Sequence, residues 1–177
     1  SDPIVVIGVG GVGLMAIATL RALGHEAVIA VDVQERNLEL ARQLGATTTI
    51  SAAQDDLGAA LVSGAGGPVA AIVDFVNNSS TAPAAFAALR KGGTMVQVGL
   101  FGGELVVPTA LLTLKIITIQ GSFVGSLGEL EELVELARRG ALPHIPIIDG
   151  QFTASSVQES LDRLAAGGVP GRIVLSA

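Results

Sequence analysis

A chain of 177 residues is long enough for one domain with a complete hydrophobic core. Half of its residues are hydrophobic, 23 are glycine and only 15% are charged, which is typical of a buried parallel sheet covered by helices of small residues. The net charge of −6 argues against a surface that neutralises nucleic-acid phosphates or lies on an anionic membrane. The absence of cysteine excludes disulfides, thiolate zinc ligands and a cysteine nucleophile, and it is compatible with the reducing cytoplasm, where we expect the protein to reside.

Apolar runs alternate with helical patterns along most of the chain. The apolar runs predict strands over residues 4–7, 27–31, 47–50, 69–76, 94–98 and 116–124. The spacing of leucine, alanine and valine predicts helices over residues 11–23, 34–44, 55–63, 83–90 and 129–139, with Gly92-Gly93 ending the fourth, whereas residues 99–113 show no regular pattern. This alternation predicts the α/β class, as a Rossmann doubly wound parallel sheet with helices on both faces.

The pattern changes from Leu142 onward. Pro143 and Pro146 bracket a short apolar piece, which a helix over residues 155–166 and a strand over residues 172–175 follow. We therefore divide the chain into the α/β domain, residues 1–141, and a C-terminal segment, residues 142–177.

Residues 3–20 carry no charge and are long enough to be compared with a membrane span. Four glycines crowd positions 8–13, which weakens a lipid-spanning helix but suits a tight turn between a strand and a helix. No basic segment precedes this stretch as it would in a signal peptide. We therefore expect no membrane partner and no nucleic-acid partner.

Residues 8–13 match the pattern G-x-G-x-x-G between a predicted strand and a predicted helix. Gly8 permits the tight turn, Gly10 lets a pyrophosphate approach the backbone, and Gly13 lets helix and strand pack closely. The start of the helix offers N–H groups and the positive end of its dipole to the phosphates. Asp32 ends the second predicted strand, 19 residues after Gly13, where a carboxylate can accept hydrogen bonds from both adenosine ribose hydroxyls. The alternative is a glycine turn inside an apolar core, with Asp32 capping the next helix.

The carboxylate at position 32 favours NAD over NADP, because it repels a 2′-phosphate. Arg36 lies one turn further on and partly offsets this repulsion. The predicted cofactor-binding residues of this half of the fold are Gly8, Gly10, Gly11, Val12, Gly13, Asp32, Val33 and Arg36.

Three other polar residues are candidates for a functional site. His25 and His144, the only histidines, lie in turn-like segments without a partner at metal-ligand spacing, so we interpret both as loop residues. Asp74 lies in an apolar run, and two interpretations stay open. It is either an acid satisfied at the end of the sheet or a carboxylate that faces the cofactor cleft.

With these residues, the sequence resembles the coenzyme-binding half of medium-chain dehydrogenases, especially the zinc-dependent alcohol dehydrogenase branch. The likeness extends over nearly the whole chain and implies hydride transfer between NAD and an alcohol or carbonyl substrate. Besides the glycine motif, it is carried by Ala30-Val31-Asp32, residues 40–46, Val73-Asp74-Phe75-Val76, Lys91-Gly92-Gly93, Val98-Gly99, Gly121-Ser122 and Gly171-Arg172.

The resemblance assigns roles to residues in the second half of the chain. It implies that Val76 lies near the adenosine side of the cleft, and that Val98, Gly99 and Leu100 run along the nicotinamide. Asn77 departs from the glycine that relatives commonly have after this valine, which puts the adenosine-side contact in doubt.

The resemblance also implies cofactor contacts near the end of the chain. Ser122 and Val124 are expected to offer main-chain contacts to the carboxamide. Arg172 is expected to reach the pyrophosphate, and a surface salt bridge is its alternative.

The family's other half supplies the catalytic zinc ligands, the proton relay and most of the substrate pocket. It has no counterpart in these residues, so we expect no catalytic residue here and zinc, if any, only in the missing half. The start at Ser1-Asp2-Pro3, directly before an apolar run, suggests an excised piece that binds cofactor without turning over substrate. The likeness further implies a homodimer or homotetramer formed through edge strands in residues 111–124.

Two other functions remain open from the sequence. A zinc-independent quinone or enoyl reductase of the same superfamily is the nearer one, but such enzymes more often select NADPH, which Asp32 disfavours. A stand-alone nucleotide-sensing Rossmann module would explain the missing catalytic half, but the C-terminal segment resembles the part that returns to the catalytic domain in dehydrogenases.

Overall fold

The computed structural model describes residues 2–167 and 169–177. Its strands are β1 (Ile4–Ile7), β2 (Val28–Asp32), β3 (Thr48–Ser51), β4 (Val69–Asp74), β5 (Leu89–Gln97), β6 (Thr118–Gly121), β7 (Ile147–Gln151) and β8 (Arg172–Ser176). Its helices are α1 (Gly11–Ala22), α2 (Glu35–Gln43), α3 (Leu57–Gly64), α4 (Thr81–Ala88), α5 (Thr109–Lys115), α6 (Leu127–Arg138) and α7 (Ala154–Ala165). No helix in these described ranges is both long and apolar enough to cross a membrane.

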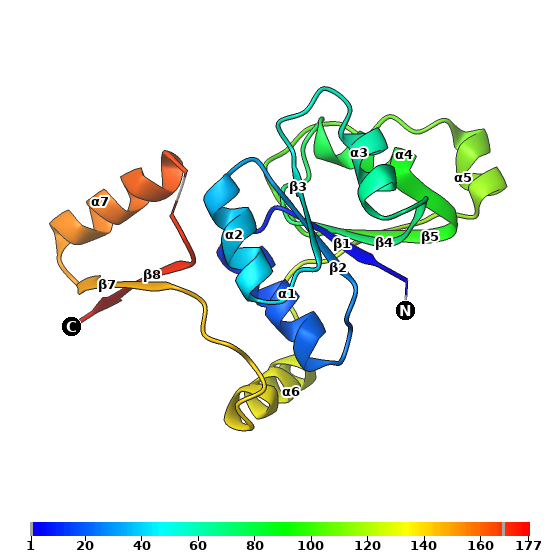
Figure 1. Ribbon diagram of the computed structural model, residues 1–177. Coiled ribbons are helices and arrows are strands. Elements are labelled where there is room, and N and C mark those ends of the chain that lie inside the picture. Colours follow the sequence, from blue (N-terminus) through cyan, green and yellow to red (C-terminus); the bar gives the residue numbers. More distant parts are fainter. Residues whose placement is uncertain (1, 168) are drawn as a thin grey trace.

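The first six strands form one parallel sheet in the order β3-β2-β1-β4-β5-β6 (Figure 1). This is the strand order of the doubly wound Rossmann fold, in which the chain reverses direction across the sheet between β1 and β4. The predicted fold class is therefore confirmed. The reversal also places the crevice of such a sheet beyond the carboxyl ends of β1 and β4.

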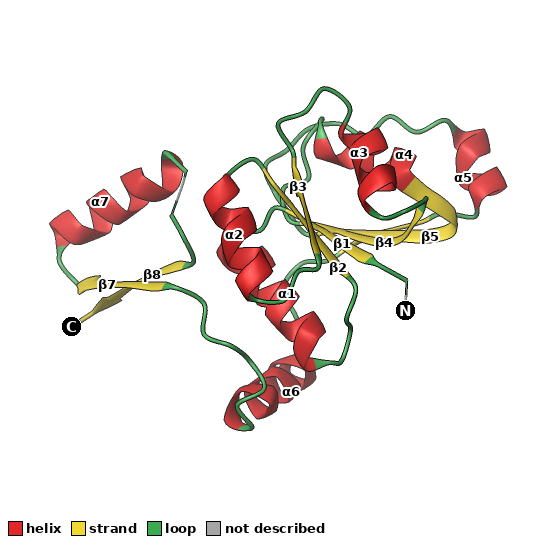
Figure 2. Ribbon diagram, in the orientation of Figure 1, coloured by secondary structure: helices red, strands yellow, loops and turns green. Residues whose placement is uncertain are grey.

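Helices cover both faces of the sheet because alternate residues of each strand point to opposite sides (Figure 2). On one face Val5 and Ile7 of β1 pack in a cluster with residues of α3 and α4. On the other face Val6 packs with Leu14 of α1 and Leu38 of α2. Burial on both faces explains why the central strands are almost uninterrupted hydrophobic runs.

The boundary between α4 and β5 differs from the prediction. The helix ends at Ala88 and the strand begins at Leu89, whereas the sequence suggested a helix to residue 90 that Gly92-Gly93 would end. Leu89 already pairs with Val69, and the register then jumps to the pair Ala71 and Thr94. The prediction was wrong here because the glycine pair forms an irregularity inside the strand rather than a helix end.

Strand β6 is shorter than the predicted strand over residues 116–124. Ile116 and Val124 have left-handed backbones, with φ of 53° and 55°, and this conformation ends an extended strand at both sides. Helix α5 directly precedes it in the stretch for which the sequence showed no pattern.

The C-terminal segment contains a strand that the prediction missed, β7. It pairs in parallel with β8 in a separate two-stranded sheet, and α7 connects the two strands. Figure 1 shows this unit, drawn in orange and red, beyond the edge of the main sheet on the side of α1 and α2. The backbone N–H of Arg172 donates to the carbonyl of Pro146, which fixes where β8 begins.

Candidate cofactor-binding site

The glycine turn lies at the carboxyl end of β1, and its glycines differ in what surrounds them. Gly8 has a φ of +81°, a conformation that glycine adopts without strain. A Cβ on Gly13 would occupy the position of the Gly8 carbonyl oxygen, so helix α1 can approach β1 only without a side chain there. A Cβ on Gly10 would meet nothing within 4 Å, which leaves this position open on the outer side of the turn.

Helix α1 begins directly at this turn. Gly10 is its N-cap and makes no side-chain cap hydrogen bond, and the first turn carries no acidic residue. The first amides of a helix have no intrahelical acceptor and sit at the positive end of the helix dipole. The turn therefore has the geometry that binds a phosphate group.

Asp32 connects the second strand to the glycine turn. Its Oδ2 accepts a hydrogen bond of 2.9 Å from the backbone N–H of Val9. Its Oδ1 accepts from the backbone N–H of Gln34 at 2.9 Å and from Nδ2 of Asn37 at 3.2 Å. The side chain is buried but lies at the end of β2. The carboxylate is thus held in a single orientation beside the turn.

The residues after Asp32 are more open. Val33 is 62% exposed, and Arg36 lies exposed in the first turn of α2. Val12 is half exposed on the outer side of α1. The hydrogen bonds that Val9 and Asn37 donate to Asp32 were not predicted from local sequence patterns.

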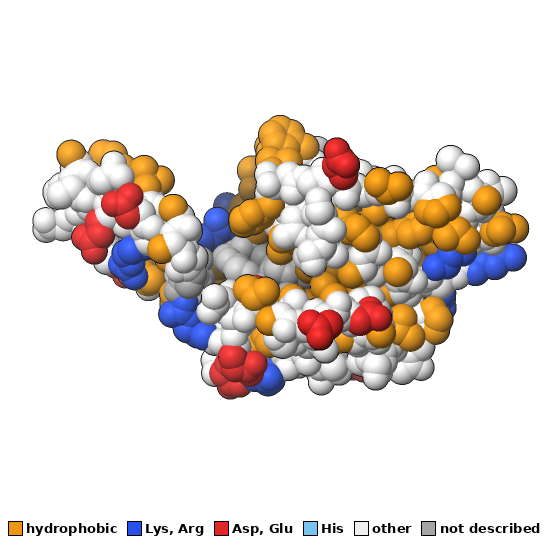
Figure 3. All heavy atoms as spheres, turned by 90° about the horizontal axis from the view of Figure 1, so that it is seen from above, with side chains coloured by type: hydrophobic (Ala, Val, Ile, Leu, Met, Phe, Trp, Pro, Cys, Tyr) orange, Lys and Arg blue, Asp and Glu red, His pale blue; other side chains and the backbone are white. Residues whose placement is uncertain are grey.

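Arg172 lies against the start of α1 although it comes from the far end of the chain. Its Cδ and Nε are each 3.3 Å from the position that a Cβ on Gly11 would take, and the Gly171 carbonyl is 2.5 Å from it. No ion pair within residues 2–167 and 169–177 uses Arg172, so the alternative role as a surface salt bridge has no partner in that part of the chain. Figure 3 shows the surface hollowed between the C-terminal unit and the main body, with Lys or Arg side chains beside the hollow.

The loops after β4 and β5 meet at the same edge of the sheet. The backbone N–H groups of Val98 and Gly99 both donate to the carbonyl of Asp74, at 2.9 and 3.0 Å. A Cβ on Gly99 would overlap the backbone carbonyl of Val76, so the two loops can touch only with glycine here. Val76 in turn lies against Gly8, since a Cβ on that glycine would be 2.6 Å from Val76 Cγ2.

The remaining predicted contacts lie near this edge. Leu100 and Val124 are each 81% exposed. Ser122 donates its backbone N–H to the carbonyl of Gln97 at 2.9 Å. A main-chain contact from Ser122 to a ligand therefore depends on its carbonyl oxygen.

Asp74 is fully buried and supports the loop that follows β4. Its Oδ1 accepts hydrogen bonds from the backbone N–H groups of Val76 at 2.9 Å and Asn77 at 2.8 Å. Oδ1 therefore has a structural task at the end of the sheet, whereas Oδ2 is buried and has no hydrogen-bond partner among the described residues.

A family model for zinc-binding dehydrogenases matches residues 11–139, nearly three quarters of the chain. The chain belongs to the zinc-binding dehydrogenase family.

Known dehydrogenases resemble this family member along almost its whole length. An alcohol dehydrogenase of Geobacillus stearothermophilus is 32% identical over 172 residues, which are 97% of this chain and 49% of that protein. An NAD-dependent alcohol dehydrogenase of Sulfurisphaera tokodaii is 33% identical over 177 residues, 99% of this chain and 50% of that protein. The chain spans about half the length of these relatives.

A solved structure shows the same relationship. The alcohol dehydrogenase of Aeropyrum pernix is 33% identical, with a TM-score of 0.90 that covers 100% of this chain and 50% of that one. The predicted membership of the medium-chain, zinc-type dehydrogenases is therefore confirmed.

The residues of this zinc-binding dehydrogenase chain do not fit a zinc site themselves. The described residues contain no group of three or more His, Cys, Asp or Glu side chains that could hold a metal ion.

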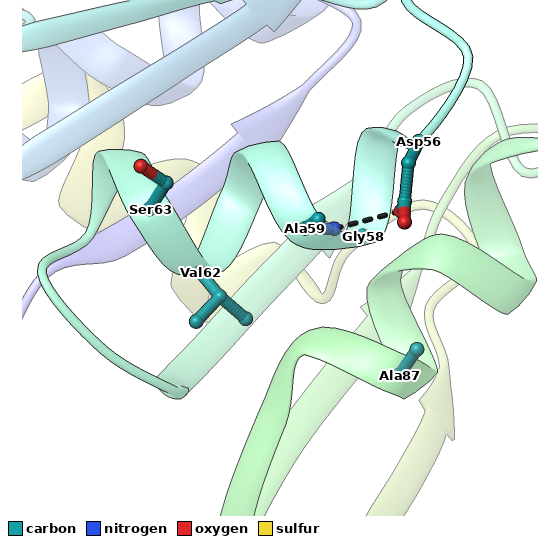
Figure 4. Close-up of a pocket in the computed structure, with 6 residues that line it drawn as sticks. All are labelled: Asp56, Gly58, Ala59, Val62, Ser63 and Ala87. Atoms are coloured by element: carbon teal, nitrogen blue, oxygen red, sulfur yellow. Dashed lines mark hydrogen bonds between the residues drawn. The ribbon is translucent and has the colours of Figure 1, made fainter.

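A groove of about 450 Å³ between α3 and α4 lies apart from the cofactor-binding residues (Figure 4). Its walls are mainly small or apolar side chains, and Asp56 is its only charged residue. Oδ1 of Asp56 accepts the backbone N–H of Ala59 at 2.9 Å and so caps α3. The groove contains no residue of the glycine turn and none of the strand ends around it.

Proposed function

We propose that this chain is the NAD-binding part of an NAD-dependent alcohol dehydrogenase. The observation that carries the proposal is the placement of three groups around one turn. The open amides of α1 begin at Gly10, the fixed carboxylate of Asp32 lies beside Val9, and Arg172 lies against Gly11. These groups suit a pyrophosphate and an adenosine ribose, and bound NAD would supply the hydride chemistry.

Each group would perform a separate task. The amides at the start of α1 would receive the pyrophosphate, and the guanidinium of Arg172 would neutralise part of its charge. Asp32 would accept hydrogen bonds from the adenosine ribose hydroxyls. Residues 98–100 would border the nicotinamide, since they follow β5 in the second half of the sheet.

The preference for NAD over NADP would come from Asp32. Its carboxylate is buried and already accepts three protein hydrogen bonds, so it cannot turn away to make room for a 2′-phosphate. Arg36 is exposed and has freedom to move, so its charge would offset only a small part of the repulsion between Asp32 and a 2′-phosphate.

Substrate chemistry would depend on groups outside these 177 residues. The relatives are about twice as long, and the described residues offer no metal cluster. We propose that the alcohol or carbonyl substrate and any zinc bind to a second part of the protein, and that this chain alone binds cofactor without turnover.

We further propose that two copies pair through the edge of the sheet at β6. This strand ends the sheet order, and apolar residues gather near it, with Leu114 68%, Ile116 62% and Phe123 78% exposed. An unpaired edge flanked by apolar side chains favours pairing with another chain.

Titration calorimetry of this chain with NAD and with NADP tests the cofactor proposal. We expect a dissociation constant for NAD that is at least about tenfold lower than for NADP, because NADP would lose a charge-assisted hydrogen bond to Asp32 and meet its negative charge. Equal affinities would contradict the role given to Asp32, and no binding of either nucleotide would contradict the proposed function as a whole.

A further inference from the structure

Asn77 joins the two loops that meet at the carboxyl edge of β4 and β5. Its Nδ2 donates to the carbonyl of Gly99 at 3.1 Å, and its Oδ1 accepts from Nε2 of Gln97 at 2.8 Å. The amide nitrogen and the amide oxygen of Asn77 therefore both make hydrogen bonds to residues at the end of β5. We call this pair of hydrogen bonds, with Asn77, Gln97 and Gly99, the amide clamp.

The backbone of Asn77 is adapted to this task. Its φ of 57° lies in the left-handed region, where asparagine is tolerated better than most side chains and glycine is accepted freely. Its N–H is held at 2.8 Å by the carboxylate of Asp74, which is fully buried. Asparagine therefore fits the backbone that glycine would favour and adds two side-chain hydrogen bonds that glycine cannot make.

Packing does not fix the clamp. Asn77 and Gln97 line a polar pocket of about 230 Å³ together with residues that include Gly102 and Glu104. Both amides are only part-buried, so they have room to adopt other rotamers. The hydrogen bonds, rather than contacts with neighbouring side chains, hold the clamp in this arrangement.

We infer that Asn77 is a positioning residue for the nicotinamide half of the cofactor. The clamp holds the carbonyl of Gly99 from one side, while the N–H of Gly99 is held by Asp74 from the other. Residue 99 is thus fixed at both its polar backbone atoms, and with it the path of residues 98–100. This inference rests on the proposed function, because those residues are the ones proposed to border the nicotinamide.

The test distinguishes contacts with the nicotinamide half of the cofactor from contacts with its adenosine diphosphate half. Binding of NADH and of ADP is measured on the chain and on its variants Asn77→Gly and Asn77→Asp. Glycine keeps the left-handed backbone but removes both bonds, and aspartate keeps the acceptor for Gln97 but opposes the Gly99 carbonyl with a carboxylate. Gln158→Ala, which removes an exposed amide from α7, is the matched control.

We expect the NADH affinity of both Asn77 variants to fall about five- to tenfold, the effect of one or two lost hydrogen bonds, with ADP affinity unchanged within about twofold. The emission of bound NADH should move toward that of free NADH in the variants and stay unchanged in Gln158→Ala. A thermal unfolding scan shows whether each variant is folded, and Asn77→Asp carries the test if Asn77→Gly is not.

Two results would overturn the inference alone. One is an unchanged ratio of NADH to ADP affinity in folded Asn77 variants, and the other is wild-type emission of bound NADH identical to that of the free cofactor. Failure of the unmodified chain to bind either NADH or ADP would instead overturn the proposed function.

Discussion

The carboxylate of Asp32 accepts the backbone N–H of Val9 at 2.9 Å, which joins the end of β2 to the middle of the glycine turn. The same side chain accepts two further hydrogen bonds, from Gln34 and Asn37. One residue therefore shapes the phosphate-binding turn and presents the carboxylate proposed for the ribose. Replacing it should affect both stability and cofactor preference.

Replacing Asp32 by glycine or asparagine is expected to narrow or reverse the preference for NAD. The loss of a charged acceptor for ribose hydroxyls should reduce NAD affinity by about 10- to 100-fold, and NADP affinity should fall less because the repulsion of the 2′-phosphate disappears. Calorimetry with both nucleotides measures the two effects. Asp55→Asn makes the same charge change at an exposed position and should leave the preference intact. An unchanged ratio in Asp32→Asn would contradict the assignment.

Two glycines of the turn should respond in opposite ways to alanine. Gly13→Ala places a methyl on the Gly8 carbonyl oxygen and should destabilise the fold by about 1–3 kcal/mol or more. Gly10→Ala has open space around the new methyl, so its melting temperature should stay near that of the unmodified chain while NAD affinity falls. Thermal unfolding and calorimetry on both variants distinguish the effects. A stable Gly10→Ala that binds NAD normally would show that the phosphates do not approach this side of the turn.

The sequence predicted those features of the site that depend on local spacing. The glycine motif and Asp32 follow directly from strand-turn-helix patterns, and the structure places Asp32 beside the glycine turn. The Val9 hydrogen bond to Asp32 and the clamp formed by Asn77 were not predicted, because they depend on how separate loops meet in space.

The errors in the predicted fold have a similar cause. Strand β7 follows Pro146 and contains Asp149 and Gly150, so its local preference for a strand is weak and its pairing with β8 decides its structure. Helix α5 has only seven residues, and the glycines and valines before it show no helical spacing of apolar residues. Nothing in the apolar run over residues 116–124 signals the left-handed backbones that shorten β6.

Replacing Arg172 by alanine is expected to weaken binding of NAD and ADP by about tenfold or more, since one charge-assisted contact to the pyrophosphate is lost. Adenosine carries no phosphate, so its binding should not change. Higher salt should reduce the difference between the unmodified chain and the variant. Arg163→Ala removes an exposed charge from α7 in the same C-terminal unit and is the matched control. Equal losses of affinity in both variants would indicate that the overall charge of the C-terminal unit, rather than a contact made by Arg172, affects binding.

Helix α6 should become less stable at low pH because of its capping box. Ser126 and Glu129 cap each other's backbone N–H groups, and the hydrogen bonds from Ser126 lower the pKa of Glu129 below its ordinary value. A lowered pKa means that the folded state favours the charged form. The stabilisation is therefore complete above the ordinary glutamate pKa and is lost as pH falls through the lowered one.

The corresponding measurement compares melting temperatures at pH 7 and pH 3. Glu129→Gln should melt below the unmodified chain at pH 7, and the difference should shrink at pH 3. Glu132→Gln changes a charge on the same helix without removing the cap and should show a smaller difference at pH 7. A difference for Glu129→Gln that is the same at both pH values would contradict this explanation.

The proposed pairing through β6 can be tested with two leucines of equal exposure. Leu114 lies just before β6, Leu23 follows α1, and each is 68% exposed. Leu114→Lys should shift the chain from dimer to monomer, because a charge is costly in an apolar interface, while Leu23→Lys should not. Light scattering over a range of concentrations measures the mass. An unmodified chain that stays monomeric at high concentration would contradict the proposal.

The position of Arg172 and Gly171 against Gly11 brings the last strand of the chain to the start of its first helix. A pyrophosphate seated on the turn would lie between these two ends of the polypeptide. Cofactor binding would therefore join the first helix to the last strand, so that the two termini of the fold would share one ligand.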